Sequence, residues 1–464
     1  MAEREIPVPE WTTKDAALMT TGVSFLMSVL AVFTGVVAAR LLGPKGRGEL
    51  VAIQAWPSAL ASLALLGTSQ AVLYFCAKEP RRRSNYLSAA LLTGTMGALI
   101  FSVVGFLAMP RLLASQSSTV VWGARIFLFQ IWMYLLIAMP TEILRASGKF
   151  TEWNLLRLCP TIIWVGIFAV AWLIGERSAA VIASAYIVLG WLILLPQLFI
   201  MRREGLCPAM PRHHEIRDTL QFGLPAVGTF LPRMLNLRLD QILMAGFLPP
   251  AALGQYVVAV AWSGAGTFLM HGVSAVLVPK LASRNERETG SGGPELARVT
   301  RFSILITALT ATGLFLFASV GIRMVFGSRF VPAIRAARLL ALAGGVAGLN
   351  LILSEGMCGL GRPASVLRAE LVALIVTAVG LWLLLRPMGI YGAALVSLLA
   401  YSVTTFWLLT EARRVTRVSI SDFLVPHHVD LVFLIRAIRQ AVASWPSVLA
   451  SVRSMFKRTV HEAP

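Results

Sequence analysis

The segment Leu220–Leu248, LQFGLPAVGTFLPRMLNLRLDQILMAGFL, is long and apolar enough to cross a membrane, yet it carries Arg233, Arg238 and Asp240. A charged side chain near the centre of a spanning helix costs about 2.5–3.5 kcal/mol on the most lenient scale. Such a group is retained where it faces a water-filled cavity, a partner or an anionic ligand. The segment therefore predicts a transport path or, alternatively, a buried Arg–Asp pair that only fixes helix packing.

The geometry of this segment separates its polar residues. Its two prolines predict kinks, which a membrane helix tolerates where neighbouring helices or water satisfy the freed carbonyl groups. On a straight helix, Arg233, Asn236 and Asp240 share one face through their i, i+3, i+7 spacing. Arg238 points away from that face and needs a different partner, or a distorted helix. We therefore predict Arg233, Asn236, Asp240 and Arg238 as substrate-binding residues.

The composition of the whole chain also indicates a membrane protein. Of its 464 residues, 57% are hydrophobic and 14% are charged. Apolar runs of about twenty residues recur from end to end, which is typical of polytopic membrane proteins and excludes a water-soluble one. The net charge of +19 does not indicate binding to nucleic acid. The basic residues lie mostly in short loops between apolar runs, where membrane topology places them.

The apolar runs predict an all-α polytopic membrane protein with about twelve transmembrane helices. Six lie in the first half, at Ala16–Leu42, Glu49–Cys76, Tyr86–Met109, Val121–Leu144, Arg157–Ile174 and Ala179–Met201. Six lie in the second half, at Leu220–Leu248, Leu253–Pro279, Phe302–Val320, Pro332–Met357, Ser365–Leu385 and Ile390–Leu409. This predicts an N-terminal tail (1–15), an N-lobe (16–201), a linker (202–219), a C-lobe (220–411) and a basic tail (412–464).

The distribution of Lys and Arg predicts the orientation in the membrane. With an even number of spans, both termini lie on one side, and that side collects 28 basic residues against 10 on the other. Three more are assigned to spans, namely Arg125, Arg233 and Arg238, and the other basic residues near span ends are counted with the adjacent loop. Because basic loops stay inside, we expect a multi-pass protein of the inner (cytoplasmic) cell membrane with both termini cytoplasmic.

The two halves of the chain show an internal repeat. At a constant offset of 206, six residues recur identically: Leu42, Pro44, Gly48, Val51, Ala55 and Trp56 match Leu248, Pro250, Gly254, Val257, Ala261 and Trp262. At an offset of 213, Glu142, Gly148 and Lys149 correspond to Glu355, Gly361 and Arg362. Six helices per half make the repeats parallel, related by an axis normal to the membrane. Two facing six-helix bundles are the usual architecture for alternating access.

The repeat bears on the charged segment as well. At the offset of 206, Arg233 and Arg238 correspond to Met27 and Val32, so these charges belong to the second half only. A structural role in the shared scaffold would more naturally appear in both halves. The asymmetry favours a functional role.

Other polar residues within the spans are weaker candidates. Gln54 and Asn350 suit a sugar-binding cavity, although interhelical hydrogen bonds explain them equally well. Glu142 and Glu355 are candidates for binding a coupling H⁺ or Na⁺, although pairing with a neighbouring arginine is simpler. The sequence shows no metal-ligand spacing and no catalytic motif, so it predicts no cofactor, no metal and no enzyme activity.

The C-terminal tail is too polar to cross the membrane. Val429–Gln440 and Trp445–Lys457 carry apolar residues at helical spacing with basic residues opposite. This pattern predicts amphipathic helices on the inner leaflet, held by apolar burial and by anionic lipid. The alternative is a tail that binds a partner protein.

Several segments resemble a known family. AARLLGPKGRGE (residues 38–49), LRLDQILMAGFLPPAALGQYVVA (residues 237–259) and the repeated Glu-x5-Gly-Lys/Arg are similar to segments of polysaccharide-biosynthesis flippases. These belong to the multidrug/oligosaccharidyl-lipid/polysaccharide (MOP) exporter superfamily. The similarity extends over Ala16–Arg414. It implies a V-shaped, MATE-like bundle that moves an undecaprenyl-diphosphate-linked saccharide from the inner to the outer leaflet.

The resemblance also implies a cationic cavity facing the diphosphate, which Arg233 and Arg238 match. Lipid II flippases of this superfamily usually have two additional C-terminal spans. The first span here also lacks arginines at the places where a lipid II flippase would be expected to present them. We therefore expect a capsular, exopolysaccharide or O-antigen repeat unit instead. Polysaccharide polymerases and glycosyltransferases are the expected protein partners.

Alternative functions remain at this stage. A lipid II flippase and an ion-coupled multidrug antiporter belong to the same superfamily, although a cationic drug would favour carboxylates over the two arginines. A membrane glycosyltransferase or polymerase usually needs a large catalytic loop, which the sequence lacks. A scaffold that recruits glycosyltransferases through its C-terminal tail is the remaining alternative.

Overall fold

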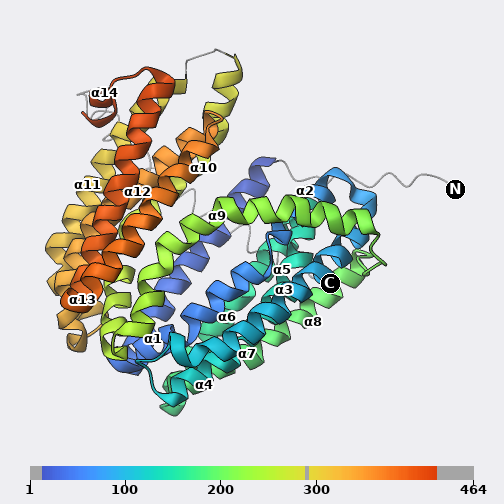
Figure 1. Cartoon of the computed structure of the whole chain (residues 1–464), viewed down its shortest axis with the longest axis horizontal. Helices are drawn as coiled ribbons and strands as arrows, with labels where there is room; N and C mark the ends of the chain where they lie inside the picture. Colours follow the sequence, from blue (N-terminus) through green and yellow to red (C-terminus); the bar gives the residue numbers. More distant parts are fainter. Residues whose placement is uncertain (1–12, 288–291, 426–464) are drawn as a thin grey trace. The chain divides into compact units, whose positions relative to one another are not determined.

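The computed structural model describes residues 13–287 and 292–425, which form helices and no strand (Figure 1). The long helices are α1 (Thr13–Ala64), α3 (Arg83–Leu112), α5 (Phe129–Ala146), α6 (Phe150–Ile174), α9 (His213–Phe247), α10 (Pro250–Arg287), α11 (Gly292–Val325), α12 (Ile334–Gly359) and α13 (Pro363–Thr416). The shorter ones are α2 (Thr68–Lys78), η1 (Pro80–Arg82), α4 (Ser118–Phe127), α7 (Ala179–Gly190), η2 (Trp191–Ile193), α8 (Leu194–Arg203), η3 (Ser328–Ala333) and α14 (Ile420–Leu424). The amphipathic helices expected at 429–440 and 445–457 lie outside the described residues.

Eight segments of the described chain are long and apolar enough to cross a membrane. Two of them, Met19–Lys78 with 60 residues and Pro363–Thr416 with 54, are far too long for one crossing of a core about 30 Å thick. Each contains two of the spans predicted from the sequence. The helices α9 and α10, which are not among the eight, contain two further predicted spans. All twelve predicted spans therefore lie on helices, which confirms the all-α membrane class.

Glycines break the two longest helices. Within α1, Gly43 has φ 65° and ψ −176°, and within α13, Gly389 has φ 56° and ψ −134°. Residues with a side chain rarely adopt a positive φ, so glycine provides the change of direction between consecutive spans. The break at Gly43 lies between the predicted spans Ala16–Leu42 and Glu49–Cys76.

Contacts divide the chain into two compact units. Unit 1 comprises the described residues up to Gly264 together with Leu314–Ala341 and Glu370–Ala400. Unit 2 comprises Ala265–Gly313, Leu342–Ala369 and the described residues from Tyr401 onward. The core of unit 2 is apolar and includes Ile352, Met357, Leu408 and, from α14, Phe423, all of them fully buried.

Unit 1 combines a tightly packed interior with an apolar exterior. Helix α9 packs against α1, α2 and α3 in this unit. Small residues allow close approach: a Cβ on Gly97 of α3 would lie 2.1 Å from the carbonyl oxygen of Ala64. On the outside of α3, Leu99 and Leu107 are 57% and 70% exposed. Exposed large apolar side chains along a membrane-length helix are expected where lipid is the solvent.

Loops that the topology predicts on the same side of the membrane lie together in unit 1. At one end, Arg40 Nε donates to Val325 O at 2.8 Å, and Ser115 Oγ donates to Leu248 O at 3.0 Å. At the other end, Lys149 contacts Glu204. The loops before α3 and α9 also meet there, where Arg82 Nη1 donates to His214 Nε2 at 2.8 Å. The structure therefore agrees with the alternation of the predicted spans, while the cytoplasmic assignment stays a prediction.

The sequence repeat appears in the structure as reciprocal backbone contacts. A Cβ on Gly48 would lie 1.7 Å from the carbonyl oxygen of Pro250, and a Cβ on Gly254 would lie 1.9 Å from that of Pro44. Pro44 and Pro250, like Gly48 and Gly254, are 206 residues apart. The contact of Gly48 with Pro250 is thus repeated by the contact of Gly254 with Pro44. Such an exchange of equivalent contacts is what a two-fold relation between the repeats requires.

Candidate functional site

The polar residues of Leu220–Leu248 all lie on α9, a single helix that includes both of its prolines. Figure 1 shows α9 changing direction along its length. Arg233 and Arg238 are exposed, Asn236 is half-buried and Asp240 is buried. The two arginines and Asp240 thus differ in burial, and the choice between a transport path and a packing pair stays open on this helix.

Asp240 is held by hydrogen bonds from neighbouring groups. Its Oδ2 accepts a hydrogen bond from the hydroxyl of Tyr256 on α10, and its Oδ1 accepts one from the backbone N–H of Gln241 at 2.7 Å. The Tyr256 hydroxyl also lies 3.5 Å from Ser397 Oγ on α13. Asp240 is only 9% exposed. This carboxylate therefore connects three helices in the interior, and its contact with substrate stays a prediction.

Asn236 makes a second polar connection between α9 and α13. Its Nδ2 donates to the carbonyl oxygen of Glu370 at 2.9 Å and to Glu370 Oε2 at 2.7 Å. Thr377 Oγ1 donates to Asn236 Oδ1 at 3.5 Å. Asn236 and Asp240, one helical turn apart, thus both face partner helices, as their spacing predicts.

Four residues of these contacts are not among those predicted from the sequence: Tyr256, Ser397, Glu370 and Thr377. Glu370 could have been identified from the sequence, because an ionisable residue inside the predicted span Ser365–Leu385 is costly. Such a residue is a candidate for binding a partner or a ligand. Tyrosine, serine and threonine are common in membrane helices, and no local pattern links Tyr256 or Ser397 to Asp240.

The remaining predicted residues occupy separate places. Gln54 is half-buried on α1. Asn350, on α12 of unit 2, donates to Tyr401 O at 3.0 Å and accepts from Thr405 Oγ1 at 2.6 Å, which are the interhelical hydrogen bonds weighed as its alternative.

The two glutamates considered for ion coupling lie in different units. Glu142, at the end of α5 in unit 1, pairs with Arg145 at 3.4 Å. Glu355 is half-buried on α12 in unit 2. The pairing of Glu142 matches the simpler of its two interpretations, and their role in coupling stays a prediction.

The electrostatic character of α9 follows from this arrangement. Within its apolar part, Asp240 and Asn236 face inward and accept or donate hydrogen bonds, while Arg233 and Arg238 are exposed. Exposure of a guanidinium along a membrane helix is tolerated where it meets water or an anion, not where it meets hydrocarbon. Guanidinium offers a planar fork of donors that matches phosphate oxygens. The exposed face of α9 is therefore suited to an anionic headgroup.

The fold is similar to those of solved transporters. It matches the structure described as "Lipid II flippase MurJ, inward closed conformation" with a TM-score of 0.73 and 16% identity, over 96% of this chain and 100% of that one. It matches an inward-facing multidrug resistance MATE family transporter of the MOP superfamily with a TM-score of 0.68 and 14% identity, over 87% and 99%. It matches an outward-facing multidrug resistance MATE family transporter with a TM-score of 0.54 and 16% identity, over 88% of this chain and 98% of that one.

At these identities the likeness concerns the fold, which is that of MOP-superfamily transporters. Among curated proteins, none matches the sequence significantly. Residues 37–335 match the model of a family described as "Polysaccharide biosynthesis protein", which covers more than half of the chain. The resemblance found in the sequence is thereby confirmed. This multi-pass membrane protein belongs to the polysaccharide biosynthesis protein family.

Proposed function

We propose that the protein is a flippase that moves an undecaprenyl-diphosphate-linked oligosaccharide repeat unit from the inner to the outer leaflet by alternating access. The observation that carries the proposal is the exposure of Arg233 and Arg238 on the membrane-length helix α9. Membership of a polysaccharide biosynthesis family and the MOP fold support the same conclusion. The repeat unit would serve a capsular polysaccharide, an exopolysaccharide or an O-antigen.

The arginines address the main physical barrier to flipping. A diphosphate loses its hydration when it enters hydrocarbon, and fixed guanidinium groups in a hydrated path replace part of that solvation. The polyprenyl chain stays in lipid throughout. Outward movement of a negative group across an inside-negative potential releases about 2.3 kcal/mol per charge per 100 mV. The membrane potential therefore favours export even before any coupled H⁺ or Na⁺ is considered.

Two related functions fit the observations less well. An ion-coupled multidrug antiporter would need an accessible carboxylate for its cationic substrate, whereas Asp240 is buried and bonded to Tyr256. A lipid II flippase shares the diphosphate chemistry, and the fold is similar to one. The family match to polysaccharide biosynthesis favours the oligosaccharide substrate.

Complementation of a flippase-deficient strain, read out as surface polysaccharide, tests the proposal. We expect Arg233→Ala and Arg238→Ala each to reduce export about 10-fold or more, the effect of losing one charge-assisted contact to phosphate. Lipid-linked precursor should accumulate on the inner side. Arg→Lys variants at both positions should retain part of the activity, since they keep the charge but lose the fork.

Arg217→Ala is the matched control, because Arg217 is an exposed arginine on the same helix, near its start. Membrane abundance of every variant is measured by immunoblot. Full export by both alanine variants at normal abundance would contradict the proposal. Accumulation of lipid II, in place of the lipid-linked oligosaccharide, in the inactive variants would instead assign lipid II as the substrate.

A further inference from the structure

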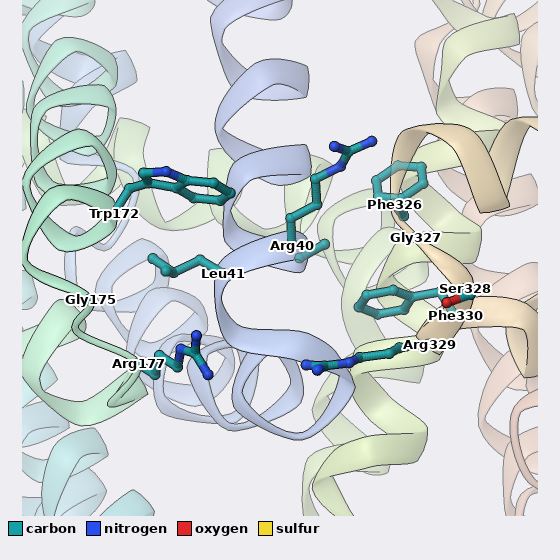
Figure 2. Close-up of a pocket in the computed structure, with 11 residues that line it drawn as sticks. Arg40, Leu41, Trp172, Gly175, Arg177, Phe326, Gly327, Ser328, Arg329 and Phe330 are labelled. Atoms are coloured by element: carbon teal, nitrogen blue, oxygen red, sulfur yellow. The ribbon is translucent and has the colours of Figure 1, made fainter.

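A second group of arginines surrounds a cavity of about 600 Å³ in unit 1, at the end where the α1 break lies. Three segments contribute to it: the part of α1 before Gly43, the end of α6 with the following loop, and the connection from α11 into η3. Arg40, Arg177 and Arg329 line it, one from each segment, beside Trp172, Phe326 and Phe330. Figure 2 shows Arg177 and Arg329 extending toward α1 from opposite sides, with Arg40 above them.

The charges in this cavity are of one sign. Its eleven lining residues include three arginines and no carboxylate. Neither Arg177 nor Arg329 makes an ion pair within the described part of the chain, and both side chains are exposed. The adjacent Glu176 is engaged elsewhere, because its Oε1 accepts the backbone N–H of Ser178 at 2.7 Å. Three cations that line one cavity without a counter-charge attract an anion.

Arg40 has a structural contact and spare donors. Its Nε donates to Val325 O at 2.8 Å and its Nη2 donates to Met324 O, so it satisfies carbonyl groups at the end of α11. A guanidinium has five N–H donors, and these two bonds leave three of them for a ligand. The contact fixes Arg40 at the edge of the cavity, so little side-chain freedom is lost on binding.

The shared scaffold does not require Arg40. At the repeat offset of 206, Arg40 corresponds to Gly246. A Cβ on Gly246 would lie 2.7 Å from Leu112 O, and Gln116 Nε2 donates to Ala245 O at 2.9 Å. The equivalent place in the second half is therefore closed by direct contacts. Arg40 is therefore not part of the repeated scaffold.

We propose that Arg40, Arg177 and Arg329 form a binding site for a phosphate-bearing anion, distinct from the arginines of α9. Phosphate suits such a cavity, because its several oxygens can each accept hydrogen bonds from a guanidinium group. The apolar wall made by Trp172, Phe326 and Phe330 can contact a hydrocarbon or isoprenoid attached to that phosphate. The proposal does not depend on the proposed transport function, because the phosphate can come from a lipid-linked diphosphate, a membrane phospholipid or the solution.

Calorimetric titration of the purified full-length protein in a neutral detergent tests the site. Three probes distinguish the sources: farnesyl diphosphate for an isoprenoid diphosphate, short-chain phosphatidylglycerol for a phospholipid, and inorganic pyrophosphate for the free ion. The probe bound most tightly identifies the source. We expect the double variant Arg177→Gln/Arg329→Gln to bind that probe about 100-fold more weakly, or about 10-fold per arginine. Binding by the unmodified protein should also weaken as salt is added.

Arg323→Gln is the matched control, since Arg323 is exposed in the last turn of α11 but does not line the cavity. It should bind the probe as tightly as the unmodified protein does. Arg40 is left intact because its contact with α11 would confound folding with binding. Equal affinity of the double variant and the unmodified protein, or no binding of any probe by the unmodified protein, would overturn the proposal. Neither result bears on the export test of the α9 variants.

Discussion

The buried carboxylate of Asp240 depends on the donors around it. In a low-dielectric interior, an acceptor that loses its donor keeps the full cost of its lost hydration. Tyr256 supplies the only side-chain donor to Asp240 given by the described structure, and it is itself fully buried. The pair joins α9 to α10 next to the exposed Arg238. Removing the hydroxyl should therefore loosen the helix that carries the candidate substrate residues.

Tyr256→Phe tests this contact. We expect a loss of about 1–2 kcal/mol in the free energy of unfolding, because one hydrogen bond to a buried carboxylate disappears while the ring is retained. Thermal unfolding in detergent measures it as a lower midpoint. Tyr391→Phe is the control, since Tyr391 is 42% exposed. Equal midpoints for the two variants would show that the Asp240 contact adds nothing to stability.

At the scale of helices, the contact between α1 and α10 depends on having no side chain. Gly48 and Gly254 allow the two backbones to touch, and each approaches a carbonyl oxygen of the other repeat. The partner atoms belong to the backbone and cannot rotate away. A methyl group at either position must separate the helices, which also form the end of unit 1 that carries the cationic cavity.

Gly48→Ala should lower stability by about 3 kcal/mol or more, at the upper end of the usual cost of overpacking, because its Cβ would lie 1.7 Å from Pro250 O. Gly254→Ala should have a similar effect, since it disrupts the same contact from the other side. The yield of monodisperse protein in size-exclusion chromatography and the unfolding midpoint measure both. Gly166→Ala is the control, because a Cβ on Gly166 would meet nothing within 4 Å. Its yield of monodisperse protein and its unfolding midpoint should be unchanged. Normal behaviour of Gly48→Ala would contradict the reciprocal contact.

At the scale of the whole molecule, the distribution of basic residues predicts which end faces the cytoplasm. The loops at each end of unit 1 alternate along the chain, so locating one loop locates them all. Cys207, between α8 and α9, is exposed and belongs to the end predicted to be cytoplasmic. Lys45, just after the α1 break, is 78% exposed and belongs to the opposite end. These two positions provide a direct test.

A membrane-impermeant maleimide should label Lys45→Cys in intact cells. The unmodified protein should remain unlabelled until the membrane is permeabilised, because its exposed cysteines, Cys207 and Cys358, lie in predicted cytoplasmic loops. Replacing Lys45 costs little, since its 4.0 Å pair with Glu49 is a weak surface interaction. The reverse labelling pattern would show that the orientation in the membrane is opposite to the predicted one. The proposed direction of transport would then be reversed as well.

The sequence by itself determined the class of protein, the positions of its spans and its repeat. Span length and apolar character are local properties, because every backbone group must be satisfied within its own helix in lipid. The repeat was visible because close backbone contact demands glycine, as at Gly48 and Gly254. Arg233 and Arg238 stood out for the same local reason: a charge inside an apolar run is costly wherever its partner lies.

The tertiary structure alone decided which groups meet. Tyr256 with Asp240 and Glu370 with Asn236 are pairs between different helices, and nothing in either local sequence specifies the other partner. The cavity lined by Arg40, Arg177 and Arg329 was missed for the same reason, since each is an ordinary loop or helix-end arginine when considered singly. A site built from segments far apart in the chain exists only once packing brings them together, because charge and hydrogen bonding act over a few ångströms in space and not along the sequence.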